Sequence, residues 1–164
     1  MDRIARFMKV SRERFDADWR EGFPDLPSPY DGLKLPQRAT AGSAGYDFYA
    51  PAPFTLDPGE TVKIPTGIRA WIEPGWVLML FPRSGLGFRY RLRLDNTVGV
   101  VDADYFIARN EGHIFVKLTN EGRKPLSIDA GDAFAQGVFL PFGITEDDEA
   151  DAIRTGGFGS TGGG

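Results

Sequence analysis

Short apolar or alternating runs, each closed by a turn rich in glycine or proline, make up most of the chain from Gly42 onward. Runs of this kind are typical of β-strands. The turns between them include DPGE, EPGW, NEGR and DAGD. Many short strands with almost no helix predict an all-β fold, either a sandwich or a barrel. The expected strands lie at 61–72, 76–82, 91–95, 113–120, 125–130 and 134–141.

The N-terminal part differs from this pattern. Residues 4–10 form a largely apolar run that predicts a first strand, and Ser11 is placed to cap a short helix ending at Gly22. The stretch 22–37 contains four prolines and two glycines, so we expect an irregular connection there.

The C-terminal part differs again. Residues 144–151 carry five acidic side chains, as a solvated linker does. Residues 156–164 hold six glycines and a single aromatic residue, Phe158. Such a tail is typical of a disordered terminus. It also suits a lid, because glycines let the backbone wrap an anion while the ring covers one flat group.

Length and composition narrow the function classes. The 164 residues fit one β domain over 1–150, in which 1–32 are an N-terminal extension, followed by a flexible arm over 151–164. The chain has no cysteine and one histidine, which excludes thiolate metal sites and a multi-histidine site within one chain. The net charge of −4 argues against general nucleic-acid binding. No apolar run is long enough to span a membrane, and no hydrophobic signal core is present, so we expect a cytoplasmic protein.

The sequence PRSGLG follows the apolar run 76–82. Arg83, Ser84 and Gly85 place a guanidinium, a hydroxyl and backbone N–H groups at one point, and these are the parts of a phosphate cradle. An ordinary turn with a surface arginine explains the same residues equally well.

The sequence NTVGVVDADY, residues 96–105, is more informative. Asn96 and Gly99 suit a tight hairpin whose backbone groups could recognise the edge of a flat heterocycle. Asp102 follows an apolar pair, so its carboxylate is expected at the end of a strand, where it could orient a water as a general base. Asp104 is the competing carboxylate, and both could instead be turn or capping residues.

Two further polar residues lie in similar settings. Asp47 lies in a glycine-rich turn that leads into an aromatic strand, where its plain role is to accept backbone hydrogen bonds. Gln136 offers both donors and acceptors, and its plain role is that of a solvent-facing strand residue.

Taken together, these segments resemble the trimeric dUTP pyrophosphatase (dUTPase) family over roughly residues 33–164. Five motifs occur in the family's order, which makes coincidence very improbable. They are AGYDFYA at 44–50, PRSGLG at 82–87, NTVGVVDADY at 96–105, GDAFAQ at 131–136 and RTGGFGSTG at 154–162.

The resemblance implies a distorted jelly-roll or barrel-like subunit, a homotrimer, and three active sites at subunit interfaces, each closed by a neighbour's arm. It implies Mg²⁺-dependent hydrolysis of dUTP to dUMP and pyrophosphate by water attack at the α-phosphorus. This activity would limit uracil incorporation into DNA and supply dUMP for dTMP synthesis. Since Mg²⁺ is often held mainly by substrate phosphates and water, no dense protein metal cage is expected.

The resemblance also implies roles for single residues. Asp102 would activate the attacking water, Asn96 and Gly99 would read uracil, and Tyr105 would lie beneath the deoxyribose. Asp47 would be a structural carboxylate close to the site, with a possible link to the metal through water.

The remaining implied roles concern the phosphates and the lid. Arg154 would contact the terminal phosphate and Phe158 would cover uracil, with Gly159, Ser160 and Thr161 beside it. The phosphate binders on the body of the domain would be Arg83, Ser84, Gly85 and Gln136.

The chain departs from the family pattern at several places. The stretch FIARNE, 106–111, is inserted before Gly112, and EGHI overlaps its end. Ala133 stands where the family usually has arginine, and Arg154 is one residue closer to the aromatic lid residue than in the commonest spacing.

Two other functions fit parts of the sequence. A dCTP deaminase of the related fold has a similar phosphate-binding turn, but the GGFGSTG tail argues against it; a zinc deaminase is excluded because cysteine is absent. A regulatory binding module could use residues 1–32 and 106–111 as partner surfaces.

Two basic features have plain explanations. Arg89, Arg91 and Arg93 alternate as if on one strand face, and a solvated or intersubunit face explains them better than nucleic-acid binding in an acidic chain. His113 opens an expected strand and is expected to be structural.

Overall fold

The computed structural model describes residues 1–154 and 156. In this part of the chain, strands dominate and two α-helices are present, so the prediction of an all-β fold is confirmed. The strands are β1 (Ala5–Lys9), β2 (Gln37–Arg38), β3 (Tyr46–Tyr49), β4 (Phe54–Leu56), β5 (Thr61–Pro65), β6 (Ile68–Ile72), β7 (Trp76–Pro82), β8 (Leu92–Leu94), β9 (Gly99–Val101), β10 (Phe115–Asn120), β11 (Leu126–Ile128) and β12 (Ala133–Pro141). The helices are α1 (Arg12–Gly22) and α2 (Ser84–Tyr90), with 3₁₀ turns at Tyr30–Gly32 (η1) and Ala103–Ile107 (η2).

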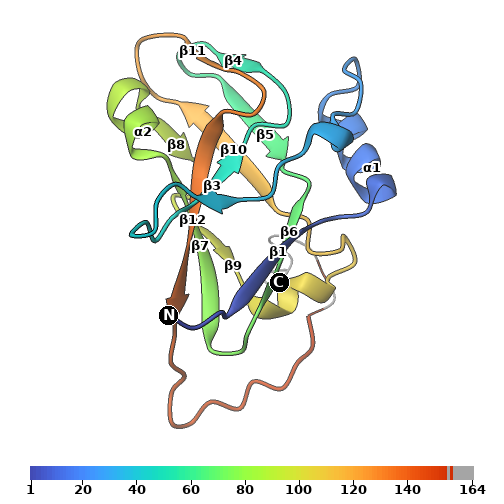
Figure 1. Ribbon diagram of the computed structural model, residues 1–164, viewed down its shortest axis with the longest axis vertical. Coiled ribbons are helices and arrows are strands. Elements are labelled where there is room, and N and C mark those ends of the chain that lie inside the picture. Colours follow the sequence, from blue (N-terminus) through green and yellow to red (C-terminus); the bar gives the residue numbers. More distant parts are fainter. Residues whose placement is uncertain (155, 157–164) are drawn as a thin grey trace.

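The strands form four antiparallel sheets, which in the described residues do not close into a barrel. The largest has the order β2-β3-β12-β7-β9, and the long β12 runs through its middle (Figure 1). The others are β5-β10-β8, β1-β6 and β11-β4. Their inward faces share one core, in which Phe48, Leu78, Leu118 and Phe134 are almost completely buried.

The expected strand 61–72 is in fact two strands. Gly67 separates β5 from β6 with a φ of +75°, a conformation that side chains rarely adopt. β5 then pairs with β10, whereas β6 pairs with β1, so the break moves the chain from one sheet to another.

The expected strand face of three arginines is wrong. Arg89 lies in α2, Arg91 ends that helix in the left-handed conformation with a φ of +52°, and only Arg93 lies on a strand, β8. The helix forms because the chain leaves β7 at Arg83 and turns at once, with the Leu86 and Gly87 N–H groups both donating to the Arg83 carbonyl.

The N-terminal extension folds as predicted and packs onto the domain. β1 pairs with β6, and Ser11 caps α1 by accepting a hydrogen bond from the Arg14 N–H at 3.1 Å. Phe15 and Trp19 of α1 bury their rings in a second, smaller core. In Figure 1, α1 lies at the side of the molecule opposite α2.

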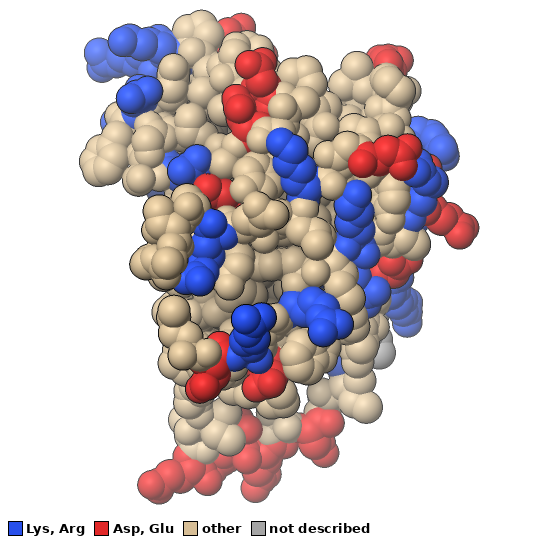
Figure 2. Space-filling view, viewed as in Figure 1, with Lys and Arg blue, Asp and Glu red and all other residues tan. Residues whose placement is uncertain are grey.

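The acidic stretch after β12 is exposed along its length, in line with the solvated linker expected from the sequence. Figure 2 shows acidic side chains gathered at the lower end of the molecule, while lysines and arginines are spread over the face above them. None of the helices in the described part of the chain is long and apolar enough to cross a membrane.

Candidate active site

The PRSGLG motif lies where β7 ends and α2 begins. β7 lies between β12 and β9 in the largest sheet; its last residues, Phe81 and Pro82, pair with β12, whereas β9 reaches only to Leu80. Arg83 occupies the N-cap position of α2, and Ser84 and Gly85 form its first turn. The three motif residues therefore lie at one point of the fold, where β7 ends and α2 begins, and the phosphate cradle expected from them stays a prediction.

Strand pairing brings Asp47 and Gln136 to the same place. Gln136 of β12 faces Asp47 of β3 on one side and Phe81 of β7 on the other. The Asp47 carboxylate lies 3.3 Å from the Arg83 guanidinium, and the Gln136 amide donates to the Pro82 carbonyl at 3.1 Å. We call Asp47, Arg83 and Gln136 the guanidinium cluster.

The loop before β9 is tight, but not in the way the sequence suggested. The positive φ falls on Thr97, at +66°, and not on Asn96 or Gly99. Gly99 is required for another reason: a Cβ added there would lie 2.9 Å from the Cβ of Leu80 on β7. The two arms of the loop also separate, since β8 pairs with β10 while β9 pairs with β7.

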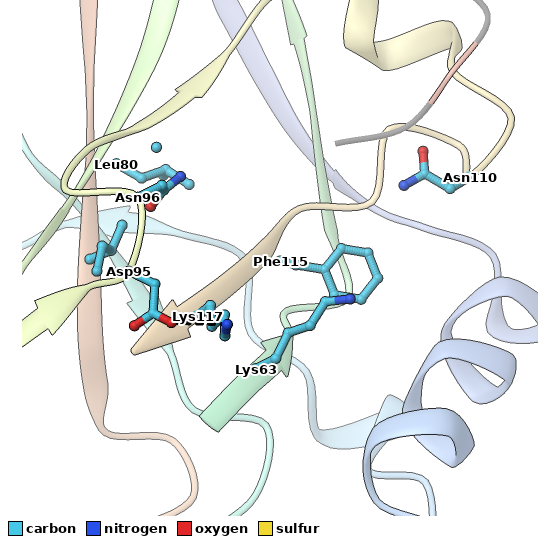
Figure 3. A pocket seen from close by; sticks show the side chains of 9 residues that line it. Lys63, Leu80, Asp95, Asn96, Asn110, Phe115 and Lys117 are labelled. Carbon is cyan, nitrogen blue, oxygen red and sulfur yellow. Dashed lines mark ion pairs between the residues drawn. The ribbon is translucent and has the colours of Figure 1, made fainter. Parts of the chain in front are cut away.

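Asn96 and Gly99 line a hollow of about 380 Å³. Figure 3 shows Lys63 and Phe115 between Asn96 on one side and Asn110 on the other. The other lining residues are Leu80, Leu94, Asp95 and Lys117.

Charged groups flank this hollow. Lys117 lies 3.0 Å from Asp95, and the Lys63 ammonium lies 4.7 Å from the centre of the Phe115 ring. The hydrogen bond from Thr119, joined by the Lys117 charge, holds the pKa of Asp95 below its usual value. Sequence reasoning missed both lysines, because only the pairing of β5 with β10, which sets Lys63 opposite Lys117, brings them together.

The predicted general base lies at the other end of β9. Asp102 follows the strand directly, and its side chain is 48% exposed. The Arg154 guanidinium donates to the Asp102 carboxylate at 2.6 Å and lies 2.9 Å from the Asp104 carboxylate. Arg154 is itself only 12% exposed. We call Asp102, Asp104 and Arg154 the carboxylate cluster.

Tyr105 lies against this cluster and is buried. The centre of its ring is 5.8 Å from the Arg154 guanidinium carbon. Its hydroxyl donates to the His113 carbonyl at 2.5 Å and accepts from the Asn110 amide at 2.7 Å. Asn110 was not singled out from the sequence, because nothing in the run FIARNE distinguishes a contact with Tyr105 from an ordinary polar turn.

The two clusters lie well apart in one chain. Leu78 of β7 faces Val101 of β9, so Arg83 and Asp102 lie in opposite directions along the strand pair. Six residue steps separate their levels, which corresponds to about 20 Å. In Figure 1, α2 and the turn that follows β9 are correspondingly far from each other. The predicted site residues therefore form three groups, which are the guanidinium cluster at the start of α2, the carboxylate cluster with Tyr105, and the pair Asn96 and Gly99 at the hollow. The remaining ones, Phe158, Gly159, Ser160 and Thr161, lie outside the described residues.

The carboxylates of the two clusters suit only one kind of metal binding. In the described part of the chain, no three Asp, Glu or His side chains come together as a metal cage. Asp47 faces Arg83, and Asp102 faces Arg154. Such a donor set fits an Mg²⁺ ion held mainly by phosphate oxygens and water.

Comparison with known proteins agrees with the fold and with the motifs. The dUTPase family model matches residues 31–162. The deoxyuridine 5'-triphosphate nucleotidohydrolase of Lactococcus lactis is 42% identical over 134 residues, which cover 80% of this chain and 89% of the relative. The corresponding protein of Chromobacterium violaceum is 43% identical over 136 residues, covering 78% and 87%.

A solved structure is also similar. The crystal structure of the dUTPase from Streptococcus mutans superposes with a TM-score of 0.65 at 35% identity, covering 85% of this chain and 98% of that one. The chain belongs to the dUTPase family. The predicted enzyme class, a nucleotide hydrolase of this family, is thereby confirmed.

Proposed function

We propose that the protein hydrolyses dUTP to dUMP and pyrophosphate, at active sites that each combine the carboxylate cluster of one chain with the guanidinium cluster of another. The observation that carries this proposal is the placement of an exposed Asp102 beside Tyr105 and Arg154, in a chain that belongs to the dUTPase family.

Asp102 acts as the general base. Its carboxylate is accessible to water and follows directly on a strand whose two inward residues are buried, so it has a firm support. It accepts a proton from a water that attacks the α-phosphorus, while the bond from that phosphorus to the bridging oxygen breaks and pyrophosphate leaves. The proton then passes to solvent, and the carboxylate is restored.

The triphosphate is held by positive charge from both clusters. Arg83, Ser84 and Gly85 bind phosphate oxygens at the start of α2, with Gln136 beside them, and Arg154 contributes from the carboxylate side. Asp47 keeps the Arg83 guanidinium oriented. Mg²⁺ bound to the phosphates would supply positive charge against their oxygens, and Asp47 would contact it through water.

The base is recognised in the hollow. Asn96 and the backbone at Gly99 bind the edge of uracil, and the close contact of Gly99 with Leu80 keeps this wall rigid. Tyr105 lies beneath the deoxyribose. Cytosine is rejected because its amino group would face a backbone donor and leave that donor unpaired. Phe158, Gly159 and Ser160 of the arm close the site.

The division of the site requires more than one chain, and the resemblance to the dUTPase family implies that the assembly is a homotrimer. Because Arg83 and Asp102 lie on opposite ends of one strand pair, a single chain cannot bring both to one triphosphate. A cyclic assembly in which each chain offers one cluster to each neighbour completes every site. Each neighbour's arm, 151–164, then covers a site.

The direct test is to incubate the protein with dUTP and Mg²⁺ and to measure pyrophosphate. We expect pyrophosphate and dUMP in equal amounts, with little turnover of dCTP, dTTP or UTP. Absence of pyrophosphate release by a folded trimer would refute the proposal. Release of ammonia from dCTP would instead identify a deaminase.

A further inference from the structure

The loop 106–112 and the N-terminal extension, which the proposed mechanism does not use, contact each other, and the loop also contacts Tyr105. The loop, 106–112, begins within η2 and ends shortly before β10. The extension contains α1, and residues 1–30 precede the part of the chain that the dUTPase family model matches. Three residues link the N-terminal extension to the hydroxyl of Tyr105. Asn110 of the loop contacts the hydroxyl, Glu111 of the loop contacts Ser11, and His113, just after the loop, contacts Asp18 of α1.

The first contact is made by Asn110. Its amide donates to the Tyr105 hydroxyl at 2.7 Å, and its side-chain oxygen accepts from the Gly112 N–H at 3.2 Å. The same hydroxyl donates to the His113 carbonyl. A phenol with one donor and one acceptor fixed in place cannot tilt without breaking a hydrogen bond in a buried setting. Asn110 also lines the hollow that contains Asn96 (Figure 3).

The second contact is made by Glu111. Its carboxylate accepts from the Ser11 N–H at 2.8 Å and from the Ser11 hydroxyl at 2.6 Å, at the beginning of α1. Burial raises the pKa of Glu111, but the hydrogen bonds from Ser11 together with the charges of Arg69 and Arg14 outweigh that effect, and the net pKa is lowered. Glu111 has a φ of +61°, and Gly112, at +70°, has no room for a Cβ, which would lie 2.7 Å from the Tyr105 carbonyl oxygen.

The third contact is made by His113, which is fully buried. The Gly67 N–H donates to Nε2 at 2.8 Å, so Nε2 is unprotonated and Nδ1 donates to Asp18 of α1 at 2.6 Å. Asp18 is held in turn by Arg14, one turn earlier in the same helix. The His113 carbonyl accepts the hydrogen bond from the Tyr105 hydroxyl, and the His113 side chain is bonded to Asp18. The partner of the Tyr105 hydroxyl is therefore anchored to α1.

We propose that α1 and the loop 106–112 form a brace that fixes the ring of Tyr105, and that Asn110 is the positioning residue through which the brace sets the preference for deoxyribose over ribose. This inference rests on the proposed function, in which Tyr105 lies beneath the sugar. A ring that excludes a 2'-hydroxyl must not yield when that oxygen approaches, because a small displacement is enough to admit it. The brace supplies this resistance, and one of its two parts, α1, precedes the region that the family model matches.

The test compares the ratio of kcat/KM for dUTP to kcat/KM for UTP in matched variants. Asn110→Leu removes the amide donor at similar size, and we expect the ratio to fall about tenfold, mainly through improved use of UTP. Arg109→Gln changes the exposed neighbouring residue and is expected to leave the ratio unchanged. A purely structural role would lower both values of kcat/KM together and leave the ratio as it was.

Two further variants address the route of the effect. In Tyr105→Phe, adding Asn110→Leu should change the ratio by less than twofold, because the hydroxyl through which Asn110 acts is gone. Ser11→Ala removes one of the two bonds to Glu111 without touching the core, and should lower the ratio by a smaller factor. Ser11→Ala also keeps the proposal testable if Asn110→Leu fails to fold.

The outcomes separate the two proposals. If the wild-type protein does not hydrolyse dUTP, the proposed function fails. If it does, and the ratio in Asn110→Leu (or, should that variant not fold, in Ser11→Ala) stays equal to that of Arg109→Gln, the brace has no part in selecting the sugar and the present inference is wrong.

Discussion

The two charged clusters of the chain are built from similar groups and lie on opposite ends of one strand pair. In the guanidinium cluster, one arginine faces one carboxylate, and strands β3, β12 and β7 hold all parts. In the carboxylate cluster, two carboxylates share one arginine that comes from beyond residue 150. The guanidinium cluster is rigid because neighbouring strands hold its residues. The carboxylate cluster brings together the end of β9 and a segment distant in sequence.

This difference indicates how work is divided in the proposed site. In the proposed site, the guanidinium cluster would bind phosphate without rearrangement, because neighbouring strands hold its residues. In the carboxylate cluster, Arg154 contacts the proposed base, so a triphosphate arriving there would compete with Asp102 for the guanidinium. Four predictions test this division.

The largest effect is expected at the carboxylate cluster. Asp102→Asn keeps the shape of the side chain but cannot accept the proton, so kcat should fall by roughly 10²–10⁴ with nucleotide binding retained. Pyrophosphate release and nucleotide titration measure the two quantities. Asp104→Asn is the matched control, and an equal loss of kcat there would mean that the base is wrongly assigned.

The second prediction concerns whether the clusters come from different chains. Arg83→Ala should lower activity by roughly 10²–10³, because a fixed positive charge on the phosphates is lost. Refolding it together with Asp102→Asn in equal amounts should restore about a quarter of the wild-type activity, since half of the interfaces are mixed and half of those join the two intact clusters. A mixture no more active than its components would place both clusters of a site on one chain.

The third prediction concerns Arg154. Arg154→Gln removes the charge from the carboxylate cluster, and we expect KM for dUTP to rise roughly tenfold with a smaller change in kcat, because a charge-assisted contact to phosphate is lost. Steady-state kinetics provides both values. A KM equal to that of the wild type would show that Arg154 serves only to pair with Asp102 and Asp104.

The smallest effect is expected in the pH dependence of the free energy of unfolding, through His113. Burial lowers the pKa of His113 below its ordinary value of 6.5, and its partner Asp18 only partly offsets this. As the pH falls below about 6.5, the unfolded chain binds a proton that the folded chain does not, so the free energy of unfolding decreases. The decrease ends at the lower pKa of the folded state.

Denaturant titrations between pH 7.5 and pH 5.5 would measure this slope. His113→Gln should have a weaker slope over the same range. Because His113 is the chain's only histidine, its imidazole resonances report its protonation directly. Protonation of His113 would disturb the brace of Tyr105 and leave the guanidinium cluster unaffected. A loss of phosphate binding over the same pH range would therefore contradict the division between the two clusters.

Local sequence patterns predicted much of the fold because they depend on neighbouring residues. The cap at Ser11, the helix that ends at Gly22 and the strand 76–82 all appear as expected. The pattern failed at 61–72 and 89–93, where tertiary pairing and the turn after Arg83 decided the outcome.

The candidate site, too, could be predicted from the sequence only in part. The motif residues Arg83 and Asp102 were readable from the sequence, and so was a turn near Gly99. The reason for Gly99 was not, because the close approach of Leu80 comes from another strand. Asn110, Lys63 and Lys117 were missed for the same reason.

By itself, the sequence determined which chemical groups the protein has, since the motifs, the turns and the alternation of apolar residues are local properties. Only the tertiary structure decided which groups meet. Strand register placed Arg83 beside Asp47 and far from Asp102, and the packing of α1 gave the loop 106–112 its hold on Tyr105. These distances depend on contacts between residues remote in the chain, and such contacts are not encoded in any one segment.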